Sequence, residues 1–370
     1  MRFTILQTYI FRVFLPSFIL SAIVFSFMVI MVNLVQFVDK GILSGFSFHF
    51  FLKATLYLLP NIFSLILPLA FLMASLLVLA ELSASGEIMA MRASGYSFNE
   101  ILLPLFLFSL VLSLLLFYTN NWLAPHYTRR SNDYIRAMAK KITKIHLQPR
   151  TFQKIIDWCI YSAEVDNKKK TLKKVKLSRV FQNKAGNKWF LRINAKTANY
   201  RILEDRGIEI NLKNGKFNRI NFKEKNNLIY GNFNLYTTFM PFFTEKMLKR
   251  KIYRFEMNTP SLLERIKKDK LDESIKLKYK IELLSRNTLF LTPLIFFVIA
   301  SPLGLLLEKG GKATSFSLSL LIIFLYYGLF TLTKVAAKKY ELFFPWIMFI
   351  PPISGFVAGT YIWKKKLYLK

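Results

Sequence analysis

Six long apolar stretches without a charged residue dominate the pattern along the chain. They lie between Arg12 and Asp39, Lys53 and Glu81, Glu100 and Arg129, Arg286 and Glu308, Lys312 and Lys334, and Glu341 and Lys364. The apolar core of a bilayer is about 30 Å thick, and a helix needs about 20 residues to cross it. Each stretch reaches this length, so the pattern predicts six transmembrane helices.

Between the third and fourth stretches the pattern changes to alternating apolar and polar residues. Turn signals interrupt the alternation at Asp166-Asn167, Ala185-Gly186-Asn187, Asp205-Arg206-Gly207 and Asn214-Gly215. Short alternating strands separated by such turns are typical of antiparallel sandwiches and jelly rolls. The sequence therefore predicts an all-β domain with one apolar interior, which we expect to be lined by Ile160, Val175, Leu191, Ile210 and Phe233.

The predicted fold is a polytopic α-helical membrane protein of six transmembrane helices with an inserted, jelly-roll-like all-β domain. Residues 1–127 carry the first three spans, 128–280 the β-domain with flanking helices around 131–145 and 259–269, and 281–370 the last three spans. The loop between spans 2 and 3 predicts a short helix at about 84–95. We expect Ser85 to cap its start and Gly95 to end it.

Composition excludes several classes of protein. With 53% hydrophobic residues and a mean hydropathy of +0.32, the chain is too apolar for a soluble enzyme or a disordered protein. The single cysteine, Cys159, can form no internal disulfide, and the three histidines have no zinc-type spacing. Gly310-Gly311-Lys312 is followed by Ala313, so no P-loop is present. We therefore predict no metal, no cofactor and no ATP hydrolysis by this chain.

Charge is concentrated in one segment. The net charge is +32, and residues 125–280 hold 38 basic and 14 acidic residues, so 24 of the net positive charges lie there. No aromatic and basic motif of the nucleic-acid-binding kind accompanies this charge, and we expect no nucleic acid partner. Basic residues in short loops favour the cytoplasmic side, which predicts cytoplasmic termini. Lys334, Lys338 and Lys339 oppose this orientation.

Several segments resemble, in order and spacing, the LptF/LptG (YjgP/YjgQ) permease family of lipopolysaccharide exporters. The loop from Gly86 to Gly95 is similar to the coupling-helix signature of the family. Phe37-Val38-Asp39-Lys40 is similar to the outer end of the first span, and Trp122-Leu123-Ala124-Pro125 to the exit from the third. Ser301-Pro302-Leu303-Gly304 resembles the family's fourth span. In the β-domain the likeness is one of pattern more than of residues, and Gly86 stands where a polar residue is expected.

The resemblance implies a permease of the bacterial inner membrane, with both termini in the cytoplasm and the β-domain in the periplasm. The implied partners are an LptB-type ATPase dimer, a second LptF/LptG-type chain, an LptC-type protein and the transported lipopolysaccharide or a related glycolipid. Coupling to the ATPase would fall to Glu87, Ile88, Met91 and Arg92. Lys40, Arg129, Arg130 and Arg136 would form a basic rim that binds lipid phosphates.

Other interpretations remain open from the residues alone. The four basic rim residues could be interface anchors whose charged ends reach the headgroups, and Glu87 could be a solvated surface carboxylate. The whole chain could be a transmembrane scaffold or signalling protein with a binding domain, in which case a filled β-domain is expected in place of an apolar conduit. A membrane-bound transferase is a third class, but no His or carboxylate pair stands out near a membrane face.

Overall fold

The computed structural model describes most of the chain. It covers residues 5–41, 48–140, 149–155, 157–167, 169–182, 188–203, 207–221, 228–241, 252–267, 272–307, 311–339 and 345–368. Two compact units are present. Met1–Val32, Thr55–Ser131 and Ile252–Lys370 form a helical unit, and Asn33–Ala54 with Asn132–Lys251 form the unit that carries a β-sheet.

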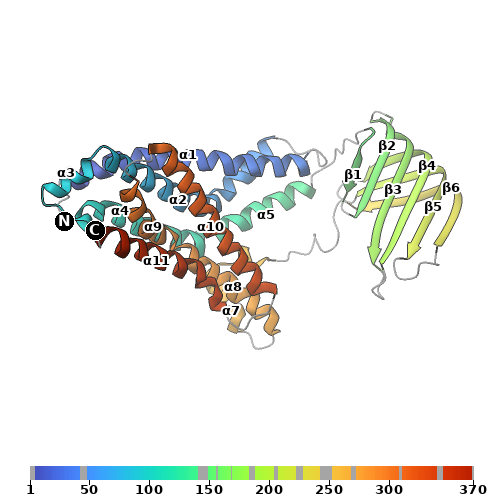
Figure 1. Cartoon of the computed structure of the whole chain (residues 1–370). Coiled ribbons are helices and arrows are strands. Elements are labelled where there is room, and N and C mark those ends of the chain that lie inside the picture. Colours follow the sequence, from blue (N-terminus) through green and yellow to red (C-terminus); the bar gives the residue numbers. More distant parts are fainter. Residues whose placement is uncertain are drawn as a thin grey trace. The chain divides into compact units, whose positions relative to one another are not determined.

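Long helices make up the first unit, and short ones join them (Figure 1). The helices are α1 (Ile5–Gly41), α2 (Phe48–Ala84), α3 (Glu87–Ala93), α4 (Phe98–Tyr118), η1 (Thr119–Leu123), α5 (Ala124–Lys140), η2 (Arg254–Glu256), α7 (Thr259–Lys267), α8 (Glu273–Leu289), α9 (Thr292–Leu306), α10 (Gly311–Lys339), η3 (Pro345–Phe349), α11 (Ile350–Ile362) and η4 (Trp363–Tyr368). Parts of helices α1, α2 and α5 belong to the second unit.

Five helical segments of the described residues are long and apolar enough to cross a membrane. They are Ile5–Val35, Phe51–Ala84, Phe98–Ile135, Lys312–Lys338 and Trp346–Lys365. A sixth span results if α8 and α9, which are bent by 41° at a short break, are counted together. Pro293, near the start of α9, removes one backbone donor next to this break. With α8 and α9 counted as one span, the prediction of a six-span helical membrane protein is confirmed.

Helix α2 forms the centre of the helical unit. Its middle segment, from Ile66 to Leu82, is buried almost all round, as expected of a helix without a polar face that is surrounded by other helices. Phe71 of α2 meets Phe14 of α1 edge to face with ring centroids 5.8 Å apart, and Phe14 contacts Phe108 of α4 in the same way at 5.2 Å. Offset and edge-to-face pairs of this kind add to the stability of a packed core.

A buried arginine holds the chain segment that precedes α7. The Arg286 guanidinium on α8 donates to the Met257 carbonyl (2.7 Å) and to the Arg254 carbonyl (3.2 Å). Its Nε lies 3.5 Å from the Glu282 carboxylate, which is also 3.8 Å from Lys334 of α10. Lys334, which seemed to oppose a cytoplasmic location of the termini, thus has a carboxylate partner within the protein.

The second unit contains one antiparallel sheet in which six described strands follow each other in chain order (Figure 1). They are β1 (Phe152–Ile155), β2 (Trp158–Asp166), β3 (Thr171–Gln182), β4 (Lys188–Leu203), β5 (Gly207–Asn221) and β6 (Leu228–Pro241). The inserted all-β domain is therefore confirmed. The jelly-roll order of strands is not, because hairpin connections alone, without a Greek-key crossover, join the described strands.

A row of unpaired residues crosses the sheet without changing the pairing register of the strands. Lys173 pairs with Thr197 and Val175 with Ala195, so that Lys174 and Lys196 between them are skipped. The same unpaired row continues through Asn214 and Asn234 on the next two strands. We call this row the corner of the sheet. Asn214-Gly215 was predicted to be a turn, which is wrong: Asn214 adopts a left-handed conformation (φ 51°) inside the continuous strand β5.

The corner keeps the apolar residues on one face of the sheet. Along β3 the buried residues are Leu172, Val175 and Leu177, so the alternation shifts by one residue at Lys174. The shift compensates for the extra residue that the corner inserts in each strand. All five residues predicted to line the interior belong to the apolar cluster on this face, with Ile160, Val175 and Ile210 buried and the other two partly buried against them.

Candidate functional site

Helix α3 lies in the loop between α2 and α4, where the sequence predicts a short helix. Gly86 precedes it in a left-handed conformation (φ 75°), and Gly95 follows it with φ 92°. The amide of Gly95 donates to the Arg92 carbonyl and that of Tyr96 to the Met91 carbonyl, which closes the last turn. The predicted cap at Ser85 is wrong, because the N-cap position belongs to Gly86 and no side chain caps it.

The carboxylate of Glu87 joins α3 to the first helix of the bundle. The Tyr9 hydroxyl of α1 donates to one Glu87 oxygen (2.7 Å), and the Ser85 hydroxyl lies 2.9 Å from the other. A carboxylate has about four acceptor positions, so both oxygens can accept further hydrogen bonds. Glu87 thus has a fixed orientation and the capacity to bind a cationic partner.

The remaining residues of α3 divide between two faces. Ile88 is only 5% exposed and belongs to the core of the helical unit, and Met91 packs against the same core. Met89 is 68% exposed, and Ala90, Arg92 and Ala93 are exposed with it. We call Met89, Ala90, Arg92 and Ala93 the outer face of α3. The Arg92 guanidinium stacks over the Phe98 ring, 4.0 Å from its centroid.

Of the four predicted coupling residues, Ile88 and Met91 pack against the core of their own bundle, whereas Met89, which was not among the four, is exposed. The helical period explains this difference. Ile88 and Met91 are three residues apart and therefore share one face of the helix, whereas Met89, which follows Ile88, points to another side. Once Ile88 and Met91 are assigned to the core, Met89 is left on the opposite side of a helix only seven residues long. An exposed methionine of this kind is a suitable contact for a partner protein. The coupling role of the four stays a prediction.

The ends of three long helices meet beside α3. Lys312 of α10 forms an ion pair of 2.8 Å with Glu81 of α2, and the Ser83 hydroxyl donates to the Leu305 carbonyl of α9 at 2.9 Å. A Cβ added to Gly304 would stand 2.6 Å from the Cβ of Leu79, so α9 and α2 are in close contact there. Helix α2, which leads into α3, is therefore in close contact with α9 and ion-paired with α10 at this end.

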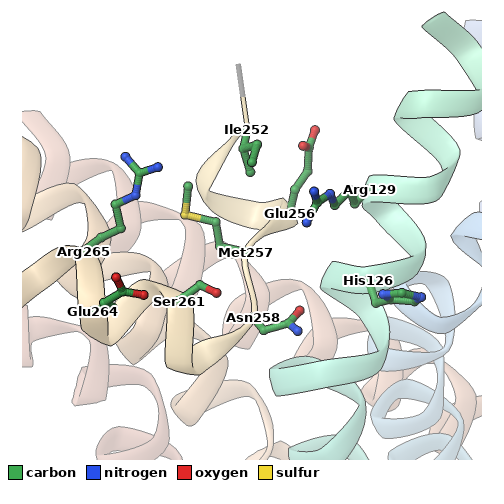
Figure 2. A pocket seen from close by; sticks show the side chains of 9 residues that line it. All are labelled: His126, Arg129, Ile252, Glu256, Met257, Asn258, Ser261, Glu264 and Arg265. Atoms are coloured by element: carbon green, nitrogen blue, oxygen red, sulfur yellow. The ribbon is translucent and has the colours of Figure 1, made fainter. Parts of the chain in front are cut away.

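At α5, α7 and η2, polar residues enclose a cavity of about 250 Å³. Figure 2 shows Arg129 extending from α5 toward Glu256, with Glu264 and Arg265 on the other side. Glu256 is only 4% exposed. A buried carboxylate is costly unless a charged or hydrogen-bonding partner faces it. His126, Ile252, Met257, Asn258 and Ser261 complete the lining.

The structure describes the side chains of two of the four predicted rim residues, and these two make different contacts. Arg129 lines the cavity of Figure 2, whereas the Arg130 guanidinium lies 5.7 Å from the Tyr127 ring centroid. Lys40 and Arg136 lie in α1 and α5, but their side chains fall outside the described part of the structure. The lipid-binding role of these residues stays a prediction.

Among the described residues, no group of three or more His, Cys, Asp or Glu side chains is arranged to hold a metal ion.

Comparison with known proteins identifies one family. The profile described as lipopolysaccharide export system permease LptF/LptG matches residues 8–365, which is nearly the whole chain. No curated protein matches the chain.

Proposed function

Because this chain belongs to the LptF/LptG family of lipopolysaccharide export permeases, we propose that it is one permease subunit of an ATP-driven exporter. In this proposal it takes lipopolysaccharide or a related glycolipid from the outer leaflet of the inner membrane and passes it to a periplasmic bridge toward the outer membrane. A separate LptB-type ATPase dimer supplies the energy, a second LptF/LptG-type chain completes the permease, and an LptC-type protein associates with it.

The geometry of α3 supports this function best. A helix that transmits force must offer an exposed face to the ATPase and be anchored in the transmembrane bundle. The outer face of α3 meets the first requirement, and the burial of Ile88 in the core meets the second. The Glu87 carboxylate, positioned by Tyr9, offers a charge to a basic residue of the ATPase. We therefore assign the ATPase contact to Glu87, Met89 and Arg92, and an anchoring role to Ile88 and Met91.

The orientation that this requires places α3 and both termini in the cytoplasm. Arg12, Arg92 and Lys312 then lie on the cytoplasmic side, as the bias of short loops favours. Lys334, Lys338 and Lys339 lie on the opposite side, where Lys334 shares the Glu282 carboxylate with Arg286. The β-domain is then periplasmic.

We further propose that the apolar face of the sheet receives the acyl chains. The cluster on this face includes Leu177, Ile193, Ile208 and Leu212, all of which are fully buried. A packed interior also fits the alternative, a scaffold or signalling protein whose periplasmic domain only binds a partner. The two functions differ in whether lipid ever enters the cluster.

Photocrosslinking within this cluster tests the proposal. A photoreactive amino acid at Ile160 or Ile210 should capture lipid when the ATPase and ATP are present, and should capture little without ATP. The matched position is Val180 on the same sheet, which is exposed. Capture at Val180 alone, or equal capture with and without ATP, would favour the scaffold over the conduit.

A further inference from the structure

The long helix that contains α4 and α5 is interrupted by one turn of π-helix, η1. Helices α4, η1 and α5 follow each other without a gap, and the backbone is helical at both junctions, Tyr118 and Ala124. At η1 the Ala124 amide donates to the Thr119 carbonyl, five residues earlier, in place of the usual four. Pro125 has no N–H and cannot supply the donor that the Asn121 carbonyl would receive in an α-helix. Single π turns of this kind occur frequently at functional sites.

Three polar residues in succession are buried at this turn. Thr119, Asn120 and Asn121 are all at most 7% exposed. The Asn121 amide donates to the Phe117 carbonyl of the same helix at 2.9 Å, and its Oδ1 accepts a hydrogen bond from the Thr259 hydroxyl at the start of α7. The amide nitrogen of Asn120 has no hydrogen-bond partner among the described residues. A buried donor of this kind disfavours the state in which it is unpaired.

The segment that donates the Thr259 bond is fixed on its other side to α8. Arg286 of α8 binds the Met257 carbonyl at 2.7 Å and the Arg254 carbonyl at 3.2 Å. Leu262 of α7 is fully buried in a small apolar cluster with Met257 and with Tyr279 of α8. Loss of the bond between Asn121 and Thr259 would therefore free α5 while η2 and α7 stay on α8.

The cavity of Figure 2 lies between the free side and the fixed side. His126 and Arg129 line it from the first two turns of α5, whereas Glu256 and Ser261 line it from η2 and α7. Close-packed side chains would resist a movement of α5, but a space of about 250 Å³ gives it room. Most of the lining is polar or charged, so a wider cavity would expose little apolar surface to water.

From these observations we propose that η1 is a hinge and that the hydrogen bond between Asn121 and Thr259 is its latch. The structure shows the latched state. When the latch opens, α5 turns about η1, the cavity changes its width, and the Asn120 amide is free to gain a partner. Because α5 begins in the helical unit and ends in the unit that carries the sheet, the hinge acts on the chain where it passes between the two. The proposal concerns this chain by itself and does not depend on lipid export.

The test measures distances by double electron–electron resonance on the full chain in detergent, in a Cys159→Ser background. One pair of spin labels is carried by Ile135→Cys on α5 and Leu263→Cys on α7, both at exposed positions. Ile135 lies 12 residues beyond Leu123, the last residue of η1. A turn of about 20° at η1 would therefore move this label by about 6 Å.

A second pair of labels, Val111→Cys on α4 and Leu321→Cys on α10, reports on the bundle before the hinge; both positions are exposed. The latch variant is Thr259→Val, which removes the hydroxyl and keeps the shape of the side chain. The control variant, Thr333→Val, removes a buried hydroxyl whose hydrogen bond stays within its own helix.

We expect Thr259→Val to shift or split the distance between the labels at 135 and 263 by about 5 Å or more, and to leave the distance between those at 111 and 321 unchanged. Thr259→Ser keeps the hydroxyl and should restore the wild-type distance, and Thr333→Val should change neither. An unchanged single distance in Thr259→Val and in Thr259→Val with Asn121→Leu would overturn the hinge. An equal change in Thr333→Val would overturn the latch. If the double variant does not fold, Thr259→Val alone decides.

Discussion

At the scale of single residues, exposure decides which side chains of α3 can meet a partner. Sequence patterns located the loop and selected Glu87, whose carboxylate is free to accept further hydrogen bonds. They could not tell which of two methionines faces outward, because a helix of seven residues gives too short a pattern to fix its phase against a core formed by distant segments. The distinction between Met89 and Met91 therefore came from the structure.

The two methionines give a paired prediction. Met89→Ala should weaken copurification of the ATPase, because burial of a large apolar side chain in an interface contributes about 1.5–3 kcal/mol. It should leave the melting temperature of the permease unchanged. Met91→Ala should instead lower the melting temperature, because it removes core packing worth about 1–3 kcal/mol. ATPase loss with Met91→Ala and none with Met89→Ala would reverse the assignment of the two faces.

Arg286 gives a second prediction at this scale. It is only 6% exposed and holds two backbone carbonyls and the Glu282 carboxylate. Arg286→Met should destabilise the helical unit by about 3–5 kcal/mol, because Glu282 then keeps only the more distant Lys334 and both carbonyls lose their donor. Thermal unfolding in detergent measures this. Arg201→Met, at an exposed position, is the control and should change stability by less than about 0.5 kcal/mol. Equal effects of the two variants would refute the role of Arg286.

At the scale of helices and strands, the transmembrane spans could be predicted because length and apolarity are properties of each segment alone. The strand order could not, since alternation gives the faces of a strand but not its neighbours. The corner shows the limit most clearly. Asn214-Gly215 has the composition of a turn, and only the pairing with β4 and β6 keeps β5 continuous through it.

The exposed surface of α10 predicts where the second permease chain binds. Leu325 and Leu332 are 59% and 68% exposed, and they flank Gly328, where an added Cβ would meet nothing within 4 Å. Small residues on an open helix face allow another helix to approach closely. In a Cys159→Ser background, cysteines at Leu325 and Leu332 should crosslink to the second chain. Val357 of α11, also exposed, is the control. Crosslinking at Val357 alone would place the interface on α11.

At the scale of the whole molecule, the chain combines a helical membrane unit with a basic β-domain and has no phosphate-binding loop of the P-loop type. Composition and charge could predict this division, because the spans are apolar enough for a membrane and the β-domain has the charged surface of a domain in water. The transport function could not be derived from composition, since composition specifies neither a partner nor a source of energy. The family match supports a transport function, and the link from α3 to an ATPase is the part of the account that we propose.

That link can be examined in proteoliposomes that contain this chain, a second permease chain and the ATPase, with ATP hydrolysis and lipid release recorded together. Glu87→Gln removes the charge but can still accept the Tyr9 hydrogen bond, whereas Tyr9→Phe removes only this bond. We predict that Glu87→Gln lowers lipid release per ATP hydrolysed by about tenfold or more, as expected when one partner of an interfacial charge pair is lost. Tyr9→Phe should stay within about twofold of wild type. Normal release by Glu87→Gln, or an equal loss in both variants, would contradict force transmission through the Glu87 charge.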